Sequence, residues 1–437
     1  MKPSPCGEVS DCVQSQTHDD TGMKLLVMAD SFLPHAGGSR VYYYSLYRHL
    51  TEQFPDRVTV LTKKVPGWKE FDARSSDNAL RIIRRFRPLP NWKYQQLPKL
   101  IPSLAQAACF VLSHRVDMVH AGDLFPQGVI AMWLKQTLGV PYLTYCHGEE
   151  ITQTDYRRFQ PRVRNAVYVS SDAVIAANGF ARANLLRIGV PAQRIFTVLP
   201  GVDSERFSPC PPRPELVRQF GLQGKLTILS VGRLVERKGH SMVLRALARI
   251  RHSIPPFQYL IVGEGPEKAA IAALARELGL SEQVILAGKA QDQQLADIYN
   301  LSDLFVLANR VVAGDLEGFG MVFLEANAAG KAVLGGRTGG TSEAVVDGST
   351  GMLVDPESVE EIAGALQLLL TNADLRQRFA DAGLRRARAE FCWPLQARRL
   401  REVCSQVLRQ RGWGEEIAAR CLSPEADGKR GATGGAA

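Results

Sequence analysis

The chain has 437 residues, more than one hydrophobic core usually organises, so two domains are expected. Hydrophobic residues make up 45% of the sequence and charged residues 22%, and no stretch is long and apolar enough to span a bilayer, which favours a globular protein over a membrane-spanning one. The formal charge of +9 suits nucleotides, phosphosugars, acidic membrane surfaces or nucleic acid, and does not choose among them.

Cysteine spacing and the first residues bear on the compartment. Eight cysteines are scattered without a Cys-x-x-Cys pair, which indicates buried thiols in a reducing compartment and not a disulfide framework or a zinc site. Residues 1–22 are polar, lack the apolar core of a signal peptide and are predicted to be disordered. We therefore expect a cytoplasmic protein, and a peripheral contact with the inner face of the membrane stays open.

The first half of the sequence alternates short apolar runs with segments of helical period. Order is expected to begin at Lys24–Asp30. The further strand candidates of this half are Val58–Thr62, Asp117–Ala121, Pro141–Cys146, Ala173–Ala177 and Ile195–Leu199. Continuous apolar strands separated by helices predict a parallel sheet that is covered on both faces.

The same pattern then starts again after a proline-rich stretch, Ser208–Pro214, which we interpret as the linker. The second set of strand candidates is Leu226–Val231, Gln258–Val262, Val284–Ala287, Leu304–Ala308 and Ala332–Leu334, with helix candidates at His240–Ile250 and Glu267–Leu278. The predicted fold is α/β, with two Rossmann-like, doubly wound domains facing a central cleft. The predicted divisions are 23–207 (acceptor domain), 208–390 (donor domain), 391–411 (a terminal helix, Leu395–Arg409, packing toward the first domain) and 423–437 (a disordered tail).

Three segments place unusual residues at strand ends, where parallel α/β sheets bind ligands. The first is Gly37–Gly38, where adjacent glycines and a helix beginning near Ser39 let backbone amides approach an anion; a plain flexible turn is equally compatible. The second is the segment 231–239, in which Arg233 and Lys238 face the cleft from one edge. Two fixed cations there would stabilise a leaving diphosphate, and we favour this over a solvated basic loop.

The third segment, 317–325, is the most specific. Glu317 lies in a glycine-rich loop before a helix that starts about Gly320 or Met321, and Glu325 lies one turn into that helix, about 6 Å along its axis. The first amides of the helix can bind phosphate oxygens while Glu325 accepts hydrogen bonds from a ribose and Glu317 meets sugar hydroxyls. The donor-contacting candidates of this segment are Glu317, Gly318, Phe319, Gly320, Met321, Val322 and Glu325.

Candidates in the first half are His147, Glu149 and Tyr42. His147 ends a strand and is expected to contact the transferred sugar, although a structural histidine is equally compatible. Glu149 is a candidate for orienting the acceptor, or a helix N-terminal carboxylate. Tyr42 is an acceptor candidate from a run of three tyrosines that we expect mostly in the core. The basic segment 81–94 either binds anionic lipid or, as we favour, is a solvated strand edge and loop.

Taken together, these segments resemble the retaining glycosyltransferases of family 4, which have the GT-B fold. The resemblance runs from about Lys24 to Arg409, and its marks are Gly37–Gly38, His147–Gly148, Leu199–Asp203, Val231–Arg233, Lys238–Gly239, Gly263–Pro266, the glutamate pair of Glu317–Glu325, and Phe391-x-Trp393. It implies that Arg233 and Lys238 bind the donor diphosphate, Gly38 approaches the phosphates, Glu325 binds the ribose, and Glu317 and His147 contact the donor sugar. Gly339–Gly340 and Glu343 also match the family, without an assigned role.

The sequence departs from the family where Pro200 precedes Gly201 directly, because an Asn often separates them. Asp315-Leu-Glu317 is not a persuasive Asp-x-Asp metal signature, so neither a metal nor another cofactor is expected. We predict a retaining hexosyltransferase that uses a nucleotide-diphosphate sugar and a lipid, glycan or small-molecule acceptor. The alternatives are an epimerase or phosphorylase-like enzyme of the same fold, a non-catalytic nucleotide-sugar-binding protein, and a nucleic-acid module, for which no motif is found.

Overall fold

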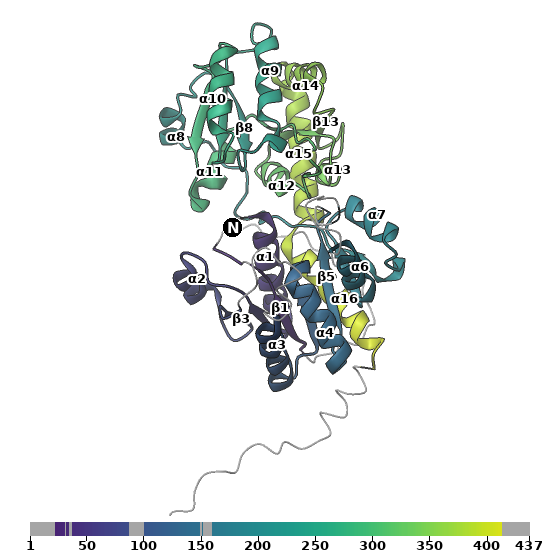
Figure 1. Cartoon of the computed structure of the whole chain (residues 1–437). Helices are drawn as coiled ribbons and strands as arrows, with labels where there is room; N and C mark the ends of the chain where they lie inside the picture. Colours follow the sequence, from purple (N-terminus) through teal and green to yellow (C-terminus); the bar gives the residue numbers. More distant parts are fainter. Residues whose placement is uncertain are drawn as a thin grey trace, which may run out of the picture.

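The computed structural model describes residues 22–30, 32–34, 37–86, 100–148, 151 and 160–412. The terminal extensions that we predict to be disordered therefore lie almost wholly outside the described residues. Within them the chain forms two lobes, each a parallel sheet covered by helices, stacked one above the other in Figure 1. This confirms the predicted fold class. No helix in the described ranges is long and apolar enough to cross a membrane.

The first sheet has seven parallel strands in the order β3-β2-β1-β4-β5-β6-β7. Its strands are β1 (Lys24–Met28), β2 (Arg57–Leu61), β3 (Leu80–Ile83), β4 (Met118–Ala121), β5 (Tyr142–Cys146), β6 (Ala173–Ala176) and β7 (Ile195–Thr197). Its helices include α1 (Gly38–Gln53), α2 (Trp68–Ser75), α3 (Ile101–His114), η2 (Leu124–Gly128), α4 (Val129–Leu138), α6 (Gln160–Ser170), α7 (Gly179–Arg187) and η3 (Ala192–Arg194). The strand order reverses between β1 and β4, and parallel α/β sheets bind ligands at the carboxyl ends of the strands at such a reversal.

The second sheet has six parallel strands in the order β10-β9-β8-β11-β12-β13. Its strands are β8 (Leu226–Val231), β9 (Phe257–Val262), β10 (Val284–Gly288), β11 (Leu304–Leu307), β12 (Ala332–Gly336) and β13 (Gly351–Val354). The helices after β7 are α8 (Pro214–Gln219), η4 (Glu236–Lys238), α9 (His240–Ile250), α10 (Lys268–Glu277), η5 (Asp292–Gln294), α11 (Leu295–Asn300), α12 (Met321–Ala328), α13 (Thr341–Ala344), α14 (Val359–Thr371), α15 (Ala373–Glu390) and α16 (Trp393–Arg409). The corresponding reversal of strand order lies between β8 and β11.

The strand candidates from apolar runs omit two strands, β3 and β13, although the favoured interpretation of the basic segment as a strand edge overlaps β3. Both have four residues and both lie at the edge of their sheet. Edge strands are buried less completely than central ones, and a run of four residues carries little periodicity, so neither stands out from the loops around it.

The chain crosses between the lobes twice, and the two crossings lie side by side. Val202 forms a β-bridge with Cys392, and Val202 and Phe207 pack in the core of the second lobe, ahead of the proline-rich stretch. A methyl group added to Gly201 would lie 2.7 Å from a ring atom of Trp393. The indole of Trp393 therefore packs directly against the backbone of Gly201, where a side chain would clash with it.

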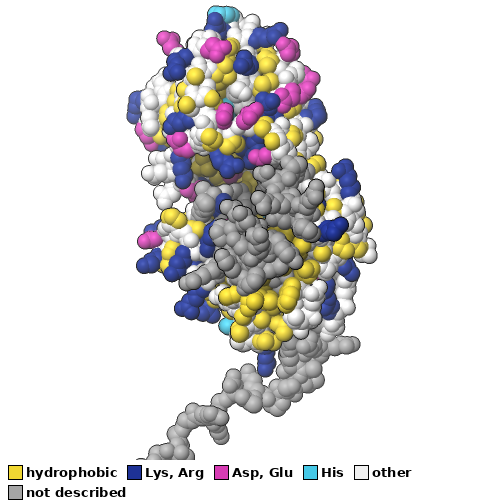
Figure 2. Space-filling model, in the orientation of Figure 1, with side chains coloured by type: hydrophobic (Ala, Val, Ile, Leu, Met, Phe, Trp, Pro, Cys, Tyr) yellow, Lys and Arg dark blue, Asp and Glu magenta, His cyan; other side chains and the backbone are white. Residues whose placement is uncertain are grey.

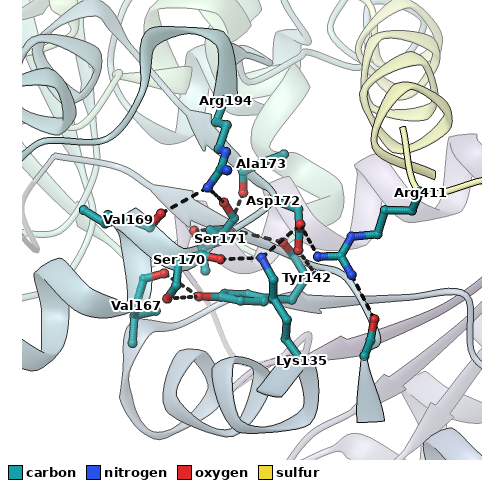
Figure 3. A network of polar contacts seen from close by, with 12 residues as sticks. Lys135, Tyr142, Val167, Val169, Ser170, Ser171, Asp172, Ala173, Arg194 and Arg411 are labelled. Carbon is teal, nitrogen blue, oxygen red and sulfur yellow. Dashed lines mark hydrogen bonds and ion pairs between the residues drawn. The ribbon is translucent and has the colours of Figure 1, made fainter. Parts of the chain in front are cut away.

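The last helix returns to the first lobe. α16 packs against α1, and its buried residues Trp393, Leu400 and Val403 belong to the same apolar core as the first sheet. Arg411, just beyond α16, donates to the Asp172 carboxylate at 2.8 Å, which also accepts from Lys135 (Figure 3). The second crossing is thereby held at its start by the Val202–Cys392 bridge and at its end by the contacts of α16 and Arg411 with the first lobe.

We expect Leu400→Ala to destabilise the first lobe by about 2–5 kcal/mol, because it leaves a cavity in a fully buried part of its core. Urea unfolding of the full-length protein, followed by circular dichroism, measures the change. Arg398→Ala on the exposed face of the same helix is the control and should shift stability by less than about 0.5 kcal/mol. Equal effects of the two substitutions would show that α16 does not contribute to this core.

Candidate active site between the two lobes

Two helix N-termini meet where the two lobes face each other. α1 of the first lobe is preceded by Gly37, and α12 of the second lobe by Gly320, and both glycines have positive φ angles. A methyl group added to Gly38 would lie 3.4 Å from Cε of Met321, so the starts of the two helices face each other closely. The positive dipole ends of both helices thus favour an anion between the lobes.

Beside them, Glu317 is held by two cations. Its Oε2 accepts from Lys238 Nζ and from Arg237 Nη1, each at 2.6 Å, and Arg237 Nε also donates to Asp315 at 3.0 Å. Burial alone would raise the pKa of Glu317, but Lys238 and Arg237 outweigh it and hold this pKa below its ordinary value. Glu317 is therefore an anion that orients the ammonium of Lys238.

Lys238 and Arg233 both stand at the carboxyl end of β8. A methyl group added to Gly232 would lie 3.5 Å from Lys238 Cε, so the lysine side chain runs back past the residue that precedes Arg233. Arg233 itself is exposed in the loop after the strand. The structure thus brings the two predicted cations to one edge of the second sheet. Arg237 was missed, because the run Glu236-Arg237-Lys238 contains no local signal that singles it out.

Glu325 lies in α12 and is the second carboxylate of the pair. Its Oε2 accepts from the hydroxyl of Tyr299, a fully buried residue of α11, at 2.6 Å. Burial raises the pKa of Glu325 despite this hydrogen bond and the nearby charges of Arg206 and Lys238. A methyl group added to Gly320, the residue before α12, would lie 3.6 Å from Cγ of Glu317, so the Lys238–Glu317 pair lies beside the start of the helix that carries Glu325. The sequence offered no signal for Tyr299, which reads as an ordinary core residue.

His147 follows β5 in the first lobe, opposite the glutamate pair of the second lobe. Its Nε2 lies 3.0 Å from the hydroxyl of Tyr43, and that hydroxyl donates its proton to the carbonyl oxygen of Gly122. Because Tyr43 has one proton to give, we assign the donor role in the His147–Tyr43 bond to Nε2–H. The main chain of His147 is close to the second lobe, since a methyl group on Gly318 would lie 3.6 Å from its carbonyl oxygen.

The expectation that Tyr42 contacts an acceptor is wrong. Tyr42 is 1% exposed, and its hydroxyl donates to the carbonyl of Val198 at 2.9 Å, so it belongs to the core. Phe319 likewise packs its ring in the core of the second lobe, beside Phe391, and leaves only its backbone for a ligand. Donor contacts of Gly318, Gly320, Met321 and Val322 remain predictions.

Part of the first-lobe expectations lies outside the described residues, namely Glu149 and positions 87–94 of the basic segment. Within the described part, Arg84 is buried and forms an ion pair with Asp72 at 2.8 Å. It also donates to the carbonyls of Leu33 and Lys63. Arg84 is therefore unavailable to a lipid headgroup, contrary to the interpretation of the basic segment 81–94 as a lipid-binding segment. Arg81 and Arg85 of the same segment are exposed.

Comparison with solved structures places this arrangement among known folds. Anabaena Alr3699/HepE in complex with UDP and glucose superimposes with a TM-score of 0.72 at 20% identity, covering 88% of this chain and 100% of that one. Sucrose-phosphate synthase from Thermosynechococcus elongatus gives 0.72 at 23% identity, covering 89% and 100%. These likenesses show the fold.

Sequence comparison adds relatives along most of the chain. A GDP-mannose-dependent alpha-(1-6)-phosphatidylinositol monomannoside mannosyltransferase of Mycolicibacterium smegmatis is 27% identical over 385 residues, covering 87% of this chain and 98% of the relative. A D-inositol 3-phosphate glycosyltransferase of Corynebacterium diphtheriae is 27% identical, covering 84% and 89%.

Two family models divide the chain between them as the two lobes do. The model for Glycosyltransferase Family 4 matches residues 36–206, and the model for Glycosyl transferases group 1 matches residues 212–386. Together with the two facing parallel sheets and the paired glutamates, these matches show that the chain is an enzyme belonging to the family 4 glycosyltransferases of GT-B fold.

Proposed function

We propose that this glycosyltransferase moves mannose from GDP-mannose to a lipid-linked acceptor, with retention of the anomeric configuration. The observation that carries the site assignment is the Lys238–Glu317 pair, which lies beside the start of α12, the helix that carries Glu325. The donor and the acceptor class are supported by relatives named as GDP-mannose-dependent phosphatidylinositol monomannoside mannosyltransferases, which align along most of this chain.

In this proposal, the bond from the anomeric carbon to the diphosphate oxygen breaks, and a bond to an acceptor hydroxyl oxygen forms on the same face. The departing diphosphate gains negative charge and takes up the acceptor proton. Lys238, Arg233 and the first amides of α12 stabilise that charge, because each presents positive charge at the same edge of the second lobe. Glu325 accepts hydrogen bonds from the ribose, and Glu317 and His147 contact the mannose.

We further propose that transfer needs no metal ion. The two carboxylates that most resemble a metal motif, Asp315 and Glu317, are both bonded to Arg237, and Glu317 also to Lys238. The positive charge that a metal would bring to a diphosphate is available from side chains and helix N-termini. Activity should therefore persist in excess EDTA, and its loss with recovery on adding Mg²⁺ or Mn²⁺ would refute this point.

A lipid acceptor requires the first lobe to reach a bilayer surface, and α3 and α4 offer a suitable face. Ile101 and Leu112 on α3 are 63% and 64% exposed, and Trp133 on α4 is 49% exposed. Figure 2 shows hydrophobic side chains gathered over this part of the lobe. Arg115, at the end of α3, adds an exposed positive charge. An apolar face with basic residues and an exposed Trp is typical of contact with anionic lipid headgroups.

Lys238→Ala should lower kcat/KM for transfer by about 10²–10³-fold, because it removes one preorganised donor to the leaving diphosphate. Radiolabelled transfer from GDP-mannose to phosphatidylinositol mannoside measures the loss. Lys225→Ala, at the opposite end of β8, is the matched control and should keep full activity. Full turnover by Lys238→Ala would remove the proposed mechanism.

A panel of GDP-mannose, UDP-glucose and ADP-glucose tests the donor by thermal shift. Ligand at 100 times its Kd should raise the melting temperature by about 5–10 °C, because binding to the folded state alone stabilises it. GDP-mannose should give the largest shift, and a larger shift with a UDP-sugar would contradict the donor assignment. Conversion of donor without any acceptor would instead indicate an epimerase.

Leu112→Glu should reduce co-sedimentation with phosphatidylglycerol-containing vesicles at least about 5-fold, since it places a charge on the proposed lipid face. Leu368→Glu is the control, because Leu368 is a similarly apolar, 43% exposed residue on α14 of the other lobe. Unchanged sedimentation of Leu112→Glu would exclude α3 from the membrane contact.

A further inference from the structure

Asn178, at the end of the β6 segment, makes contacts with both lobes. It is completely buried, and its Oδ1 caps α7 by accepting from the amide of Ala181 at 2.6 Å. Its Nδ2 donates to the carbonyl of His147 at 3.1 Å and also to the carbonyl of Gly318. Capping uses only the oxygen, which Ser supplies equally well. The amide nitrogen is therefore the part of Asn178 that ties the backbone beside Glu317 to the backbone of His147.

A second bond between the lobes lies next to it. Glu343 of α13, in the second lobe, accepts from the amide of Gly179 at 2.6 Å through its Oε1. A carboxylate is well placed there, because Gly179 is the first residue of α7 and the helix dipole is positive at that end. The backbone of α13 is fixed in turn by Arg386, which donates to the carbonyls of Glu343 and Ala344 at 2.8 and 3.0 Å.

The glycine pair before Glu343 connects this contact to the active-site loop. The amide of Gly340 donates to the carbonyl of Glu317 at 3.0 Å. Methyl groups on Gly339 and Gly340 would lie 2.2 and 2.1 Å from the carbonyl oxygens of Glu317 and Gly318, so any side chain at either position would push the loop away. The turn that carries Glu343 thus supports the backbone of Glu317 directly.

We propose that Asn178 and Glu343 form an interlobe clasp and act as positioning residues for transfer. Their two bonds hold the Glu317–Gly318 loop against His147, so that the donor-binding and acceptor-binding lobes meet in one register. The inference rests on the proposed function only for the roles of Glu317 and His147. The clasp itself is a contact of the protein alone and does not depend on which donor is bound.

Amide hydrogen exchange on the full-length protein tests the clasp without any substrate. The amide of Gly179 should exchange at least about 10-fold faster in Glu343→Ala than in wild type, because its acceptor is gone. Glu343→Gln keeps a side-chain oxygen and should retain most of the protection. Equal exchange in wild type and Glu343→Ala would overturn the clasp, and so would a Glu343→Gln variant as unprotected as Glu343→Ala.

Kinetics of Asn178→Ser then test positioning. Serine keeps the cap but loses both Nδ2 bonds, so kcat with GDP-mannose and phosphatidylinositol mannoside should fall at least about 10-fold while the donor KM changes less than about 3-fold. Asn372→Ser is the matched control, since Asn372 caps α15 through the same oxygen, at the amide of Leu375, on an exposed surface. Asn372→Ser should melt within about 2 °C of wild type because its cap is preserved, whereas Asn178→Ser also loses two buried hydrogen bonds and should melt lower while still folding cooperatively.

A wild-type kcat in Asn178→Ser, or an equal loss in Asn372→Ser, would refute the positioning role. The two proposals fail separately. If wild type shows no transfer from GDP-mannose while the Gly179 amide still loses protection in Glu343→Ala, the substrate assignment is wrong and the clasp stands.

Discussion

The ion pair between the buried ammonium of Lys238 and the carboxylate of Glu317 is the interaction around which the site is arranged. A buried charge is costly unless it is paired, and Glu317 supplies the counter-charge for the buried ammonium of Lys238. Arg237 supplies a second cation to the same carboxylate oxygen. Glu317 therefore stays paired if Lys238 turns toward a diphosphate, and a ligand can recruit the lysine without leaving an uncompensated anion.

The two glutamates of the pair are chemically identical and are given different properties by their surroundings. Glu317 precedes α12 and sits between two cations, which lower its pKa. Glu325, within the helix, is half-buried beside the Tyr299 hydroxyl, and its partial burial raises its pKa. One residue is thus suited to hold charge and orient a cation, and the other to accept hydrogen bonds from a neutral group.

The relative orientation of the two lobes is fixed by the two chain crossings and by α16. Two crossings lie side by side at Val202 and Cys392, and α16 continues from the second crossing into the core of the first lobe (Figure 1). The carboxyl ends of the two sheets consequently face each other, with α1 and α12 meeting start to start. Contacts at Asn178 and Glu343 add polar bonds beside the site, where small changes in lobe register would move Glu317 relative to His147.

The sequence by itself determined the α/β class, the duplication of the sheet, most strands, and the placing of Arg233, Lys238, Glu317 and Glu325 at strand ends or a helix start. These features are local, because apolar runs, helical periods and glycines before helices appear within a few residues of each other. Tertiary structure alone decided which of two adjacent residues of the same amino-acid type faces the site. Tyr42 and Tyr43 are adjacent tyrosines about 100° apart on one helix, and only packing of α1 on the sheet turns Tyr42 to Val198 and Tyr43 to His147. Asn178, Arg237 and Tyr299 escaped prediction for the same reason, since their partners lie far away in the chain and no local pattern reports them.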